Sequence, residues 1–252
     1  MLTSLGFIWD IDGVLVDSPH EEAWRITAMK DPWNADGMSS DFYFTHVASI
    51  PRYEGGNNIL ELKGIYDRLG AKTKEEKQKL LDRFCNEKND LIKKFMREGK
   101  FGLFTDAITL LLRSKKLSVW QGAASASKNA VAMLTRVSRS RIMSEVGNDF
   151  GVFGEHDTLN SMFDVNLCGT DATAKEEIQK AAARQLNVLS GEKIKRFVVF
   201  EDAPAGIKAA NSLGYYTVGV LRIGKKEALQ TAGADVVVRD LKKIKIEEIL
   251  TW

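Results

Sequence analysis

The chain has 252 residues, of which 44% are hydrophobic and 28% charged, and its 36 basic and 34 acidic residues leave a net charge of +2. This length allows one large domain or a core domain with an inserted one, and the composition is that of an ordinary globular protein. The balanced charge argues against a nucleic-acid or membrane partner, and no apolar stretch approaches the roughly 20 residues that span a bilayer. Without an N-terminal signal run, and with two widely separated cysteines, the chain is expected to be cytoplasmic and free of disulfides.

The first predicted strand is the apolar run Leu5–Trp9, which ends in Asp10-Ile11-Asp12-Gly13. Residues two apart in a strand point to the same face, so Asp10 and Asp12 should face one spot at the carboxyl end of the strand, where open α/β sheets bind ligands. Neighbouring carboxylates repel each other and usually need a cation. Asp10 could be a nucleophile that forms an aspartyl-phosphate, and Asp12 a general acid and base. The alternative is an Asp pair that only bonds turn backbone groups.

Residues 19 to about 103 contain little that predicts strand and much that predicts helix, including Lys74–Arg97. Ser18-Pro19-His20-Glu21 predicts a capping box with proline at the first helical position, so a helix should begin just beyond the first motif. We therefore expect a helical domain inserted after the first strand, with hinges near Asp17-Ser18 and near Phe101–Asp106.

After residue 115, short apolar runs alternate with helical patterns. The predicted strands are Leu117–Ala124, Phe163–Cys168, Phe197–Phe200, Tyr216–Leu221 and Asp235–Val238. The predicted helices are Lys128–Val137, Lys175–Leu186, Pro204–Leu213 and Lys225–Thr231. This alternation is typical of a doubly wound parallel sheet with helices on both faces, a Rossmann-like α/β core. Residues 138–162 have weak periodicity and should form an irregular insertion.

Two more predicted strands end in residues that suit a phosphate and a metal. Ser125 lies among small residues before a predicted helix, where its hydroxyl and the helix amides could bind a phosphate; a serine-rich N-cap turn is the alternative. Glu201 and Asp202 directly follow Phe197–Phe200, and two adjacent acids again need a cation. Mg²⁺ prefers hard oxygen ligands and keeps several waters, so it suits these acids, whose alternative role is an acidic helix cap.

These motifs resemble those of the haloacid dehalogenase-like hydrolases, and more narrowly the branch that holds β-phosphoglucomutase and related sugar-phosphate phosphatases. The resemblance covers nearly the whole chain. It implies that Asp10 is the nucleophile and Asp12 the acid/base, and that Mg²⁺ binds Asp10, the backbone carbonyl of Asp12, Glu201 and Asp202. The true dehalogenases lack the second aspartate, so dehalogenation is disfavoured.

The resemblance also implies a phosphate-binding string and a lysine that pairs with the nucleophile. The residues implied to bind the phosphoryl group or assist there are Ser125, Ala126, Lys128 and Asn129. The family's third motif is Lys-Pro-x-Pro-Asp, and this chain has Ala174-Lys175-Glu176-Glu177-Ile178 without either proline. Lys175 is the predicted lysine and Lys180 the second choice, while a solvated surface lysine is the alternative.

Two residues of the helical domain resemble substrate-contacting residues of the same branch. His20 precedes Glu21-Glu22-Ala23-Trp24, and Arg52 lies in Ile50–Gly55. Arg52 could bind a phosphate or carboxylate through paired hydrogen bonds. A helix-surface histidine and a surface salt bridge are the respective alternatives. If both residues are functional, the substrate is a small phosphorylated sugar or acid that the cap encloses.

We therefore expect a Mg²⁺-dependent phosphotransferase that works through phospho-Asp10, most simply a phosphatase of small phosphorylated sugars or related phosphomonoesters. A mutase, in which a sugar hydroxyl replaces water as the acceptor, shares the chemistry up to phospho-Asp10. A phosphorylatable signalling module also clusters acids and a lysine, but such domains are shorter and lack an inserted helical domain. The expected domains are a catalytic core, 1–17 with 104–252, and a helical cap, 18–103. The expected assembly is a monomer or small homo-oligomer whose partner is a small phosphorylated metabolite.

Overall fold

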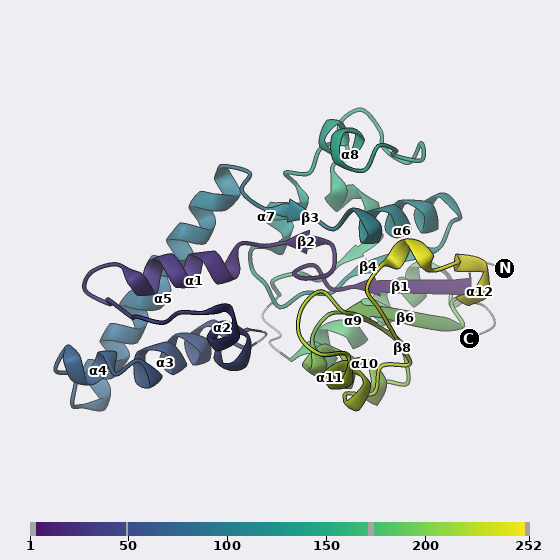
Figure 1. Cartoon of the computed structure of the whole chain (residues 1–252). Helices are drawn as coiled ribbons and strands as arrows, with labels where there is room; N and C mark the ends of the chain where they lie inside the picture. The colour runs from purple at the N-terminus through teal and green to yellow at the C-terminus, as the bar shows by residue number, and fades with distance from the viewer. Residues whose placement is uncertain (1–3, 49, 171–173, 250–252) are drawn as a thin grey trace. The chain divides into compact units, whose positions relative to one another are not determined.

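The chain divides into two compact units, one formed by Met1–Ser18 with Gly102–Trp252 and the other by Pro19–Phe101. Figure 1 traces both units along the chain in a computed structural model. The residues that this structure describes are 4–48, 50–170 and 174–249.

Six parallel strands form the sheet of the first unit, in the order β5-β4-β1-β6-β7-β8. Their bounds are β1 (Leu5–Trp9), β4 (Trp120–Ala123), β5 (Val165–Asn166), β6 (Arg196–Glu201), β7 (Tyr216–Val220) and β8 (Val236–Val238). Every residue of β1 is buried, because a strand covered on both faces favours a continuous apolar run over alternation. The predicted doubly wound α/β fold is confirmed, although β4 and β5 are shorter than predicted.

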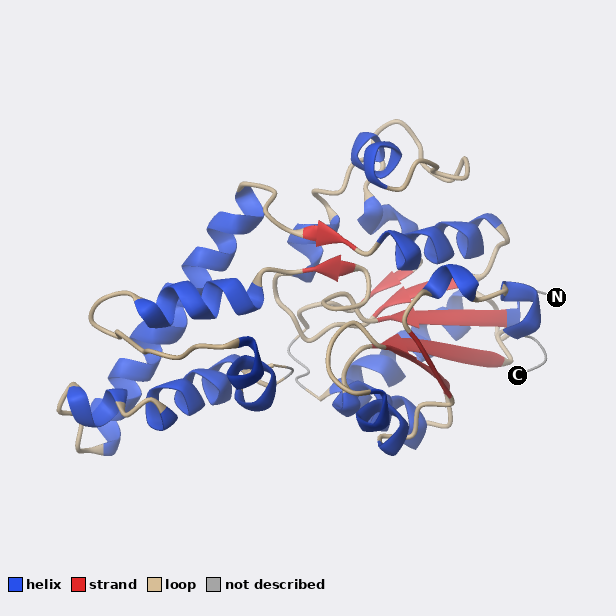
Figure 2. Cartoon of the chain, in the orientation of Figure 1, coloured by secondary structure: helices blue, strands red, loops and turns tan. Residues whose placement is uncertain are grey.

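Helices cover both faces of this sheet, with α9 and α10 on one side and α6 on the other (Figure 2). The helical segments are α6 (Thr105–Lys116), α7 (Ala130–Leu134), α8 (Arg139–Glu145), η2 (Leu159–Met162), α9 (Lys175–Leu189), α10 (Pro204–Ser212), α11 (Lys226–Thr231), η3 (Leu241–Lys243) and α12 (Ile246–Ile249). From α9, Ile178, Ala182 and Leu186 join a buried apolar cluster with Ile8 of β1. This packing fixes α9, and with it the residue at its first position, against the central strand.

Two expectations about this unit are wrong in detail. The helix predicted at Lys128–Val137 is the shorter α7, because the Ser127 hydroxyl accepts from the Asn129 amide and holds the preceding residues in a turn. The segment 138–162, predicted to be irregular, contains α8 and η2. The only buried residue of α8 is Ile142, too few apolar positions for a periodic signal.

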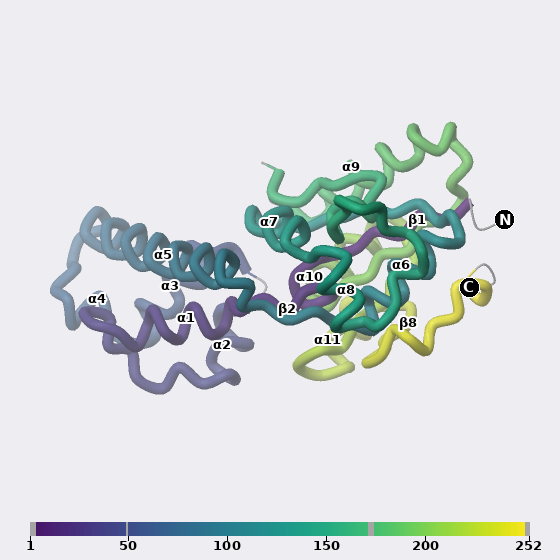
Figure 3. Tube along the Cα trace, turned by 90° about the horizontal axis from the view of Figure 1, so that it is seen from above, coloured from purple at the N-terminus to yellow at the C-terminus, as the bar shows by residue number. Residues whose placement is uncertain are grey.

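The chain leaves the first unit through β2 (Val16–Asp17) and returns through β3 (Gly102–Leu103). These two short strands pair antiparallel, so the outgoing and incoming segments run side by side (Figure 3). The amide of Phe104 adds one more bond, to the carbonyl of Leu15. Both crossings are therefore held by one small sheet.

The second unit is entirely helical among the described residues of Pro19–Phe101. Its helices are α1 (His20–Met29), α2 (Ser40–His46), α3 (Arg52–Leu62), α4 (Ile65–Arg68) and α5 (Lys74–Arg97). The predicted long helix is α5, which starts with a Thr73–Glu76 capping box and packs against α1 and α3. Trp24, Trp33 and Phe84 lie at the centre of its apolar core. Nowhere in the described residues is a helix both long and apolar enough to cross a membrane.

The capping box predicted at Ser18–Glu21 is wrong. Helix α1 begins at His20 with Pro19 as its N-cap, and no side chain of the described residues caps it. The first helical bond runs from the Ala23 amide to the Pro19 carbonyl. Ser18 therefore lies one position too early for its hydroxyl to serve as the cap oxygen.

Candidate active site

The two predicted acidic motifs lie side by side at the carboxyl ends of β1 and β6. These strands pair with Trp9 opposite Phe200, and the Asp10 amide donates to the Phe200 carbonyl over 3.0 Å. The sheet order reverses here, because β4 and β5 follow β1 on one side while β6 begins the other side. Ligands of open α/β sheets bind at such a switch point.

Lys175 joins these acids from the first position of α9. Its Nζ lies 2.7 Å from Oδ1 of Asp10 and 2.9 Å from Oε2 of Glu201. Of the two predicted lysines, Lys175 is the one at the acids, whereas Lys180 lies exposed further along the same helix. A proline is therefore not required to start α9 at the position that brings a lysine to Asp10.

Three carboxylates converge closely enough to share one cation. Asp10, Glu201 and Asp202 each offer an oxygen, and these oxygens all lie within 4.8 Å of one another. Hard anionic oxygens in this number fit Mg²⁺, which usually takes few protein ligands and completes its octahedron with water. The donor set is therefore compatible with the predicted magnesium ion.

The pKa values of these acids are raised because the carboxylates are buried next to one another. Burial, reinforced by neighbouring carboxylates, raises the pKa of Asp10, that of Glu201 well above its usual range, and that of Asp202 to about 7. Burial alone would lower the pKa of Lys175, but Asp10 and Glu201 outweigh it and raise that pKa. Lys175 is therefore held in its charged form, whereas burial and mutual repulsion oppose the charged forms of the acids.

Two glycines allow the acids to pack this tightly. A Cβ on Gly13, whose φ is +82°, would lie 2.0 Å from Oδ2 of Asp202. A Cβ on Gly206 would lie 2.0 Å from Oε2 of Glu201. Only a residue without a side chain leaves room for each carboxylate, so these glycines belong to the site although the sequence reasoning did not select them.

The predicted phosphate-binding string follows β4, next to β1. The Ala124 amide donates to the Trp9 carbonyl, so Ser125 begins at the level of Asp10. Ser125 is buried, and its hydroxyl accepts from the Ser127 amide, which leaves the hydroxyl proton available for a ligand. The remaining predicted members differ in exposure: Ala126 and Lys128 are exposed, and Asn129 is partly exposed.

The other two predicted residues belong to the helical unit. Arg52 is the first residue of α3, and its carbonyl accepts from the Cys85 thiol. His20 begins α1, and its Nδ1 lies 2.9 Å from Nζ of Lys88. Lys88 is buried in α5 with its ammonium over the Trp24 ring, a position that sequence reasoning missed because a lysine in a charged helix looks solvated.

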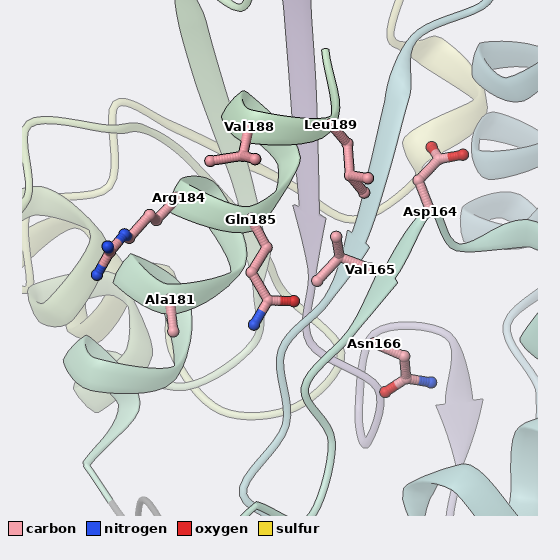
Figure 4. Close-up of a pocket in the computed structure, with 8 residues that line it drawn as sticks. All are labelled: Asp164, Val165, Asn166, Ala181, Arg184, Gln185, Val188 and Leu189. Carbon is pink, nitrogen blue, oxygen red and sulfur yellow. The ribbon is translucent and has the colours of Figure 1, made fainter. Parts of the chain in front are cut away.

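A separate groove lies between α9 and the edge strand β5 (Figure 4). Val188 and Leu189 of α9 and Asp164 and Asn166 of the β5 segment are among its lining residues. Asp164 is already bound by Lys115 and by the Gln121 amide. The groove includes none of the acids at the strand ends, so we do not assign the chemistry to it.

Comparison with known proteins agrees with this geometry. A model of the haloacid dehalogenase-like hydrolase family matches residues 5–214, and the chain belongs to that family of enzymes. It is 35% identical to the crystal structure of β-phosphoglucomutase from Pyrococcus sp. strain ST 04, with a TM-score of 0.79, covering 98% of this chain and 97% of the other.

Three sequence relatives place the chain more narrowly within the family. Bacillus subtilis β-phosphoglucomutase is 28% identical over 242 residues, 95% of this chain and 91% of that protein. Saccharomyces cerevisiae 2-deoxyglucose-6-phosphate phosphatases 1 and 2 are each 46% identical over 63 residues. This match spans only about a quarter of the chain (25%) and of each yeast protein (26%). The predicted relationship to the β-phosphoglucomutase and sugar-phosphate phosphatase branch is confirmed.

Proposed function

We propose that this chain transfers phosphoryl groups through a covalent phospho-Asp10 intermediate and acts as a phosphatase of small phosphorylated sugars or related phosphomonoesters. The observation that carries the proposal is the contact of the Asp10 carboxylate with Lys175, beside Glu201 and Asp202. A carboxylate held by an ammonium at a ligand-binding strand end is arranged to attack an anionic phosphorus.

In the first step, an oxygen of Asp10 forms a bond to phosphorus as the bond to the leaving oxygen breaks, and Asp12 donates its proton to that oxygen. In the second step, Asp12 takes a proton from water, the water oxygen bonds to phosphorus, and the bond to Asp10 breaks. Lys175 and the Ser125 hydroxyl stabilise the phosphoryl oxygens in both steps. Lys128 and Asn129 assist from the turn that follows, where the backbone of Ala126 also approaches the phosphate.

The acids of the site would hold Mg²⁺ through Asp10, Glu201, Asp202 and the backbone carbonyl of Asp12. When bound, the ion neutralises charge between the anionic nucleophile and the anionic phosphate. The raised pKa values of the three carboxylates support this assignment, because burial and mutual repulsion disfavour their charged forms and a bound cation would offset both effects.

The substrate class rests on the relatives and on the helical unit. We infer that residues 18–103 act as a cap over a core of 1–17 and 104–252, with His20 and Arg52 reading the non-reacting part of the substrate. Nδ1 of His20 lies 2.9 Å from the Lys88 ammonium and accepts from it, so that the ring proton is carried by Nε2. A small phosphorylated sugar offers both the hydroxyls and the anionic group that these residues would bind.

The test is phosphate release from a panel of phosphosugars, with Mg²⁺ or with a chelator. Mass spectrometry of acid-quenched enzyme should find one added phosphoryl group on the peptide that contains Asp10. Asp164→Asn is the matched control, because Asp164 also pairs with a lysine, 2.6 Å away, outside the cluster. Turnover without phosphate on that peptide would contradict the covalent route.

A mutase is the second candidate, favoured by similarity to β-phosphoglucomutases over nearly the full chain. In that reaction a sugar hydroxyl takes the phosphoryl group from Asp10 in place of water. Incubation with β-glucose 1-phosphate separates the two. Conversion to glucose 6-phosphate without net phosphate release assigns the mutase, and stoichiometric phosphate release assigns the phosphatase.

A further inference from the structure

Arg222 follows β7 and contacts two other segments of the first unit, one at Val14 and one at Phe104–Asp106. Its Nη1 and Nη2 each donate to one oxygen of Asp106, both over 2.9 Å. Nη2 also donates to the Val14 carbonyl over 3.2 Å, and the guanidinium stacks 4.1 Å from the ring centre of Phe104. Its side chain is only 10% exposed, so these contacts are sheltered from water.

Asp106 fixes the orientation of this arginine. It lies in the first turn of α6, and its Oδ2 also accepts from the Leu241 amide over 2.9 Å. A bidentate arginine–carboxylate pair fixes the plane of the guanidinium as well as its place. Asp106, which is bound both by Arg222 and by the Leu241 amide, therefore directs Nη2 toward the Val14 carbonyl.

Val14 belongs to the tight turn that carries Asp12. Within it the amides of Leu15 and Val16 donate to the Ile11 carbonyl over 3.0 and 2.9 Å, and the Gly13 amide donates to the Val16 carbonyl over 2.9 Å. These hydrogen bonds join the two ends of the turn. The bond from Arg222 to Val14 therefore restrains the whole turn, including Asp12.

Asp10 is held in a different way. Its amide is bonded to β6 and its carboxylate contacts Lys175, and these two contacts involve neither the turn nor Arg222. The carboxylate also accepts a hydrogen bond from the backbone of Ile11, at the start of the turn. A change at Arg222 should therefore move Asp12 more than Asp10, which β6 and Lys175 hold from outside the turn.

We propose that Arg222 is a positioning residue that holds the turn 11–16, and through it the Asp12 carboxylate, in the geometry for proton transfer. The kinetic part of this inference rests on the proposed function. Proton transfer needs donor and acceptor within hydrogen-bond reach, and a misplacement of about 1 Å lowers rates by about 100-fold.

The kinetic test compares leaving groups in Arg222→Lys. A sugar phosphate has a poor leaving group that must be protonated by Asp12, whereas p-nitrophenolate leaves without an acid. We expect kcat/KM for the sugar phosphate to fall by about 10- to 100-fold. The single-turnover burst of p-nitrophenolate should stay within about twofold of the wild type. An equal fall for both substrates, or no fall for either, would overturn the proposal.

A second measurement needs no activity. Hydrogen exchange of the segment 11–18 should be about 10-fold faster in Arg222→Lys, while exchange in β6 is unchanged. Asp106→Asn, which keeps the shape of the side chain but loses the charge, should also speed exchange in the segment 11–18 and serves if Arg222→Lys does not fold. Arg139→Lys is the matched control, because Arg139 also pairs with an aspartate, Asp149, but is half exposed and distant in sequence from the turn.

The two measurements separate the inferences. If the wild type turns over no phosphomonoester, the proposed function fails, and the exchange result still decides whether Arg222 holds the turn. If turnover is present and exchange in 11–18 is the same in the wild type and both variants, the positioning role is wrong.

Discussion

Asp10 and Asp106 are both sheltered aspartates next to a cation, yet their pKa values move in opposite directions. Burial raises the pKa of Asp10, and Lys175 does not overcome this. At Asp106 burial also acts to raise the pKa, but the bidentate Arg222 and backbone amides outweigh it and lower the pKa. The pKa of the same residue type in the same unit is therefore raised at one place and lowered at the other.

The difference lies in the balance of charge. Lys175 stands among four acids, Asp10, Asp12, Glu201 and Asp202, so three negative charges would remain if all were ionised. Arg222 and Asp106 balance one to one. An unbalanced cluster favours binding of a further cation, which a catalytic site can use, whereas a balanced pair contributes to holding the fold together.

Asp10→Asn should break the comparison most strongly. Turnover should fall at least about 1,000-fold, because an amide cannot form the phosphoryl intermediate. The melting temperature of the metal-free protein should rise, because one of the crowded charges is removed. Steady-state kinetics and thermal unfolding in chelator measure the two effects. Unchanged turnover would show that Asp10 is not the nucleophile.

Asp106→Asn should have the opposite effect on stability. It leaves the Arg222 guanidinium sheltered without its counter-charge, and breaking such a pair lowers the free energy of unfolding by about 3–5 kcal/mol. Urea denaturation measures the change. Glu61→Gln is the control, because it breaks the more exposed pair with Lys77 and should lower stability by less than about 1 kcal/mol. Equal losses of unfolding free energy in the two variants would show that the Arg222–Asp106 pair contributes no more to stability than an exposed salt bridge.

Magnesium should stabilise the acidic cluster by a smaller amount. At a concentration 100 times its dissociation constant, a ligand that binds only the folded state adds about 2.7 kcal/mol to the free energy of unfolding. Thermal unfolding with Mg²⁺ and with chelator measures this. Asp202→Asn should reduce the response, because one of the three converging oxygens loses its charge. A melting temperature that does not change with Mg²⁺ would show that the acidic cluster does not bind magnesium.

The balance of charge also separates what the sequence could predict from what it could not. Asp10, Glu201 and Asp202 directly follow apolar runs that form central strands, so their meeting follows from parallel pairing. Lys175 could be predicted because a helix that follows a parallel strand begins near the carboxyl end of the strand, at the edge of the sheet where the acids lie. It is preferred to Lys180 because it stands at the start of the predicted helix, and the structure places Lys175 against Asp10.

Arg222 and Asp106 carry no such local signal. They are 116 residues apart, and neither lies in a sequence pattern that indicates which residue it pairs with. Lys88 was missed for the same reason, because its burial against Trp24 depends on the packing of α5 on α1. The capping box at Ser18 failed for a different reason: a motif fixes residue types, whereas a shift of one position in the helix start changes which residue is the cap.

The smallest expected effect is the acid dependence of the Arg222–Asp106 pair. The folded-state pKa of Asp106 lies below the ordinary value of 3.8, so its contribution to stability is complete above that value and is lost as pH falls through the folded-state pKa. The difference in unfolding free energy between the wild type and Asp106→Asn should therefore be constant from about pH 7 to 5 and shrink below about pH 4. Arg222→Met removes the guanidinium that opposes the effect of burial on the pKa of Asp106. The pKa of Asp106 should then be lowered less, so the loss of stability towards acid pH should be smaller. Urea titrations across this range measure the trend, and a difference that grows towards acid would mean that Asp106 is not held in its charged form.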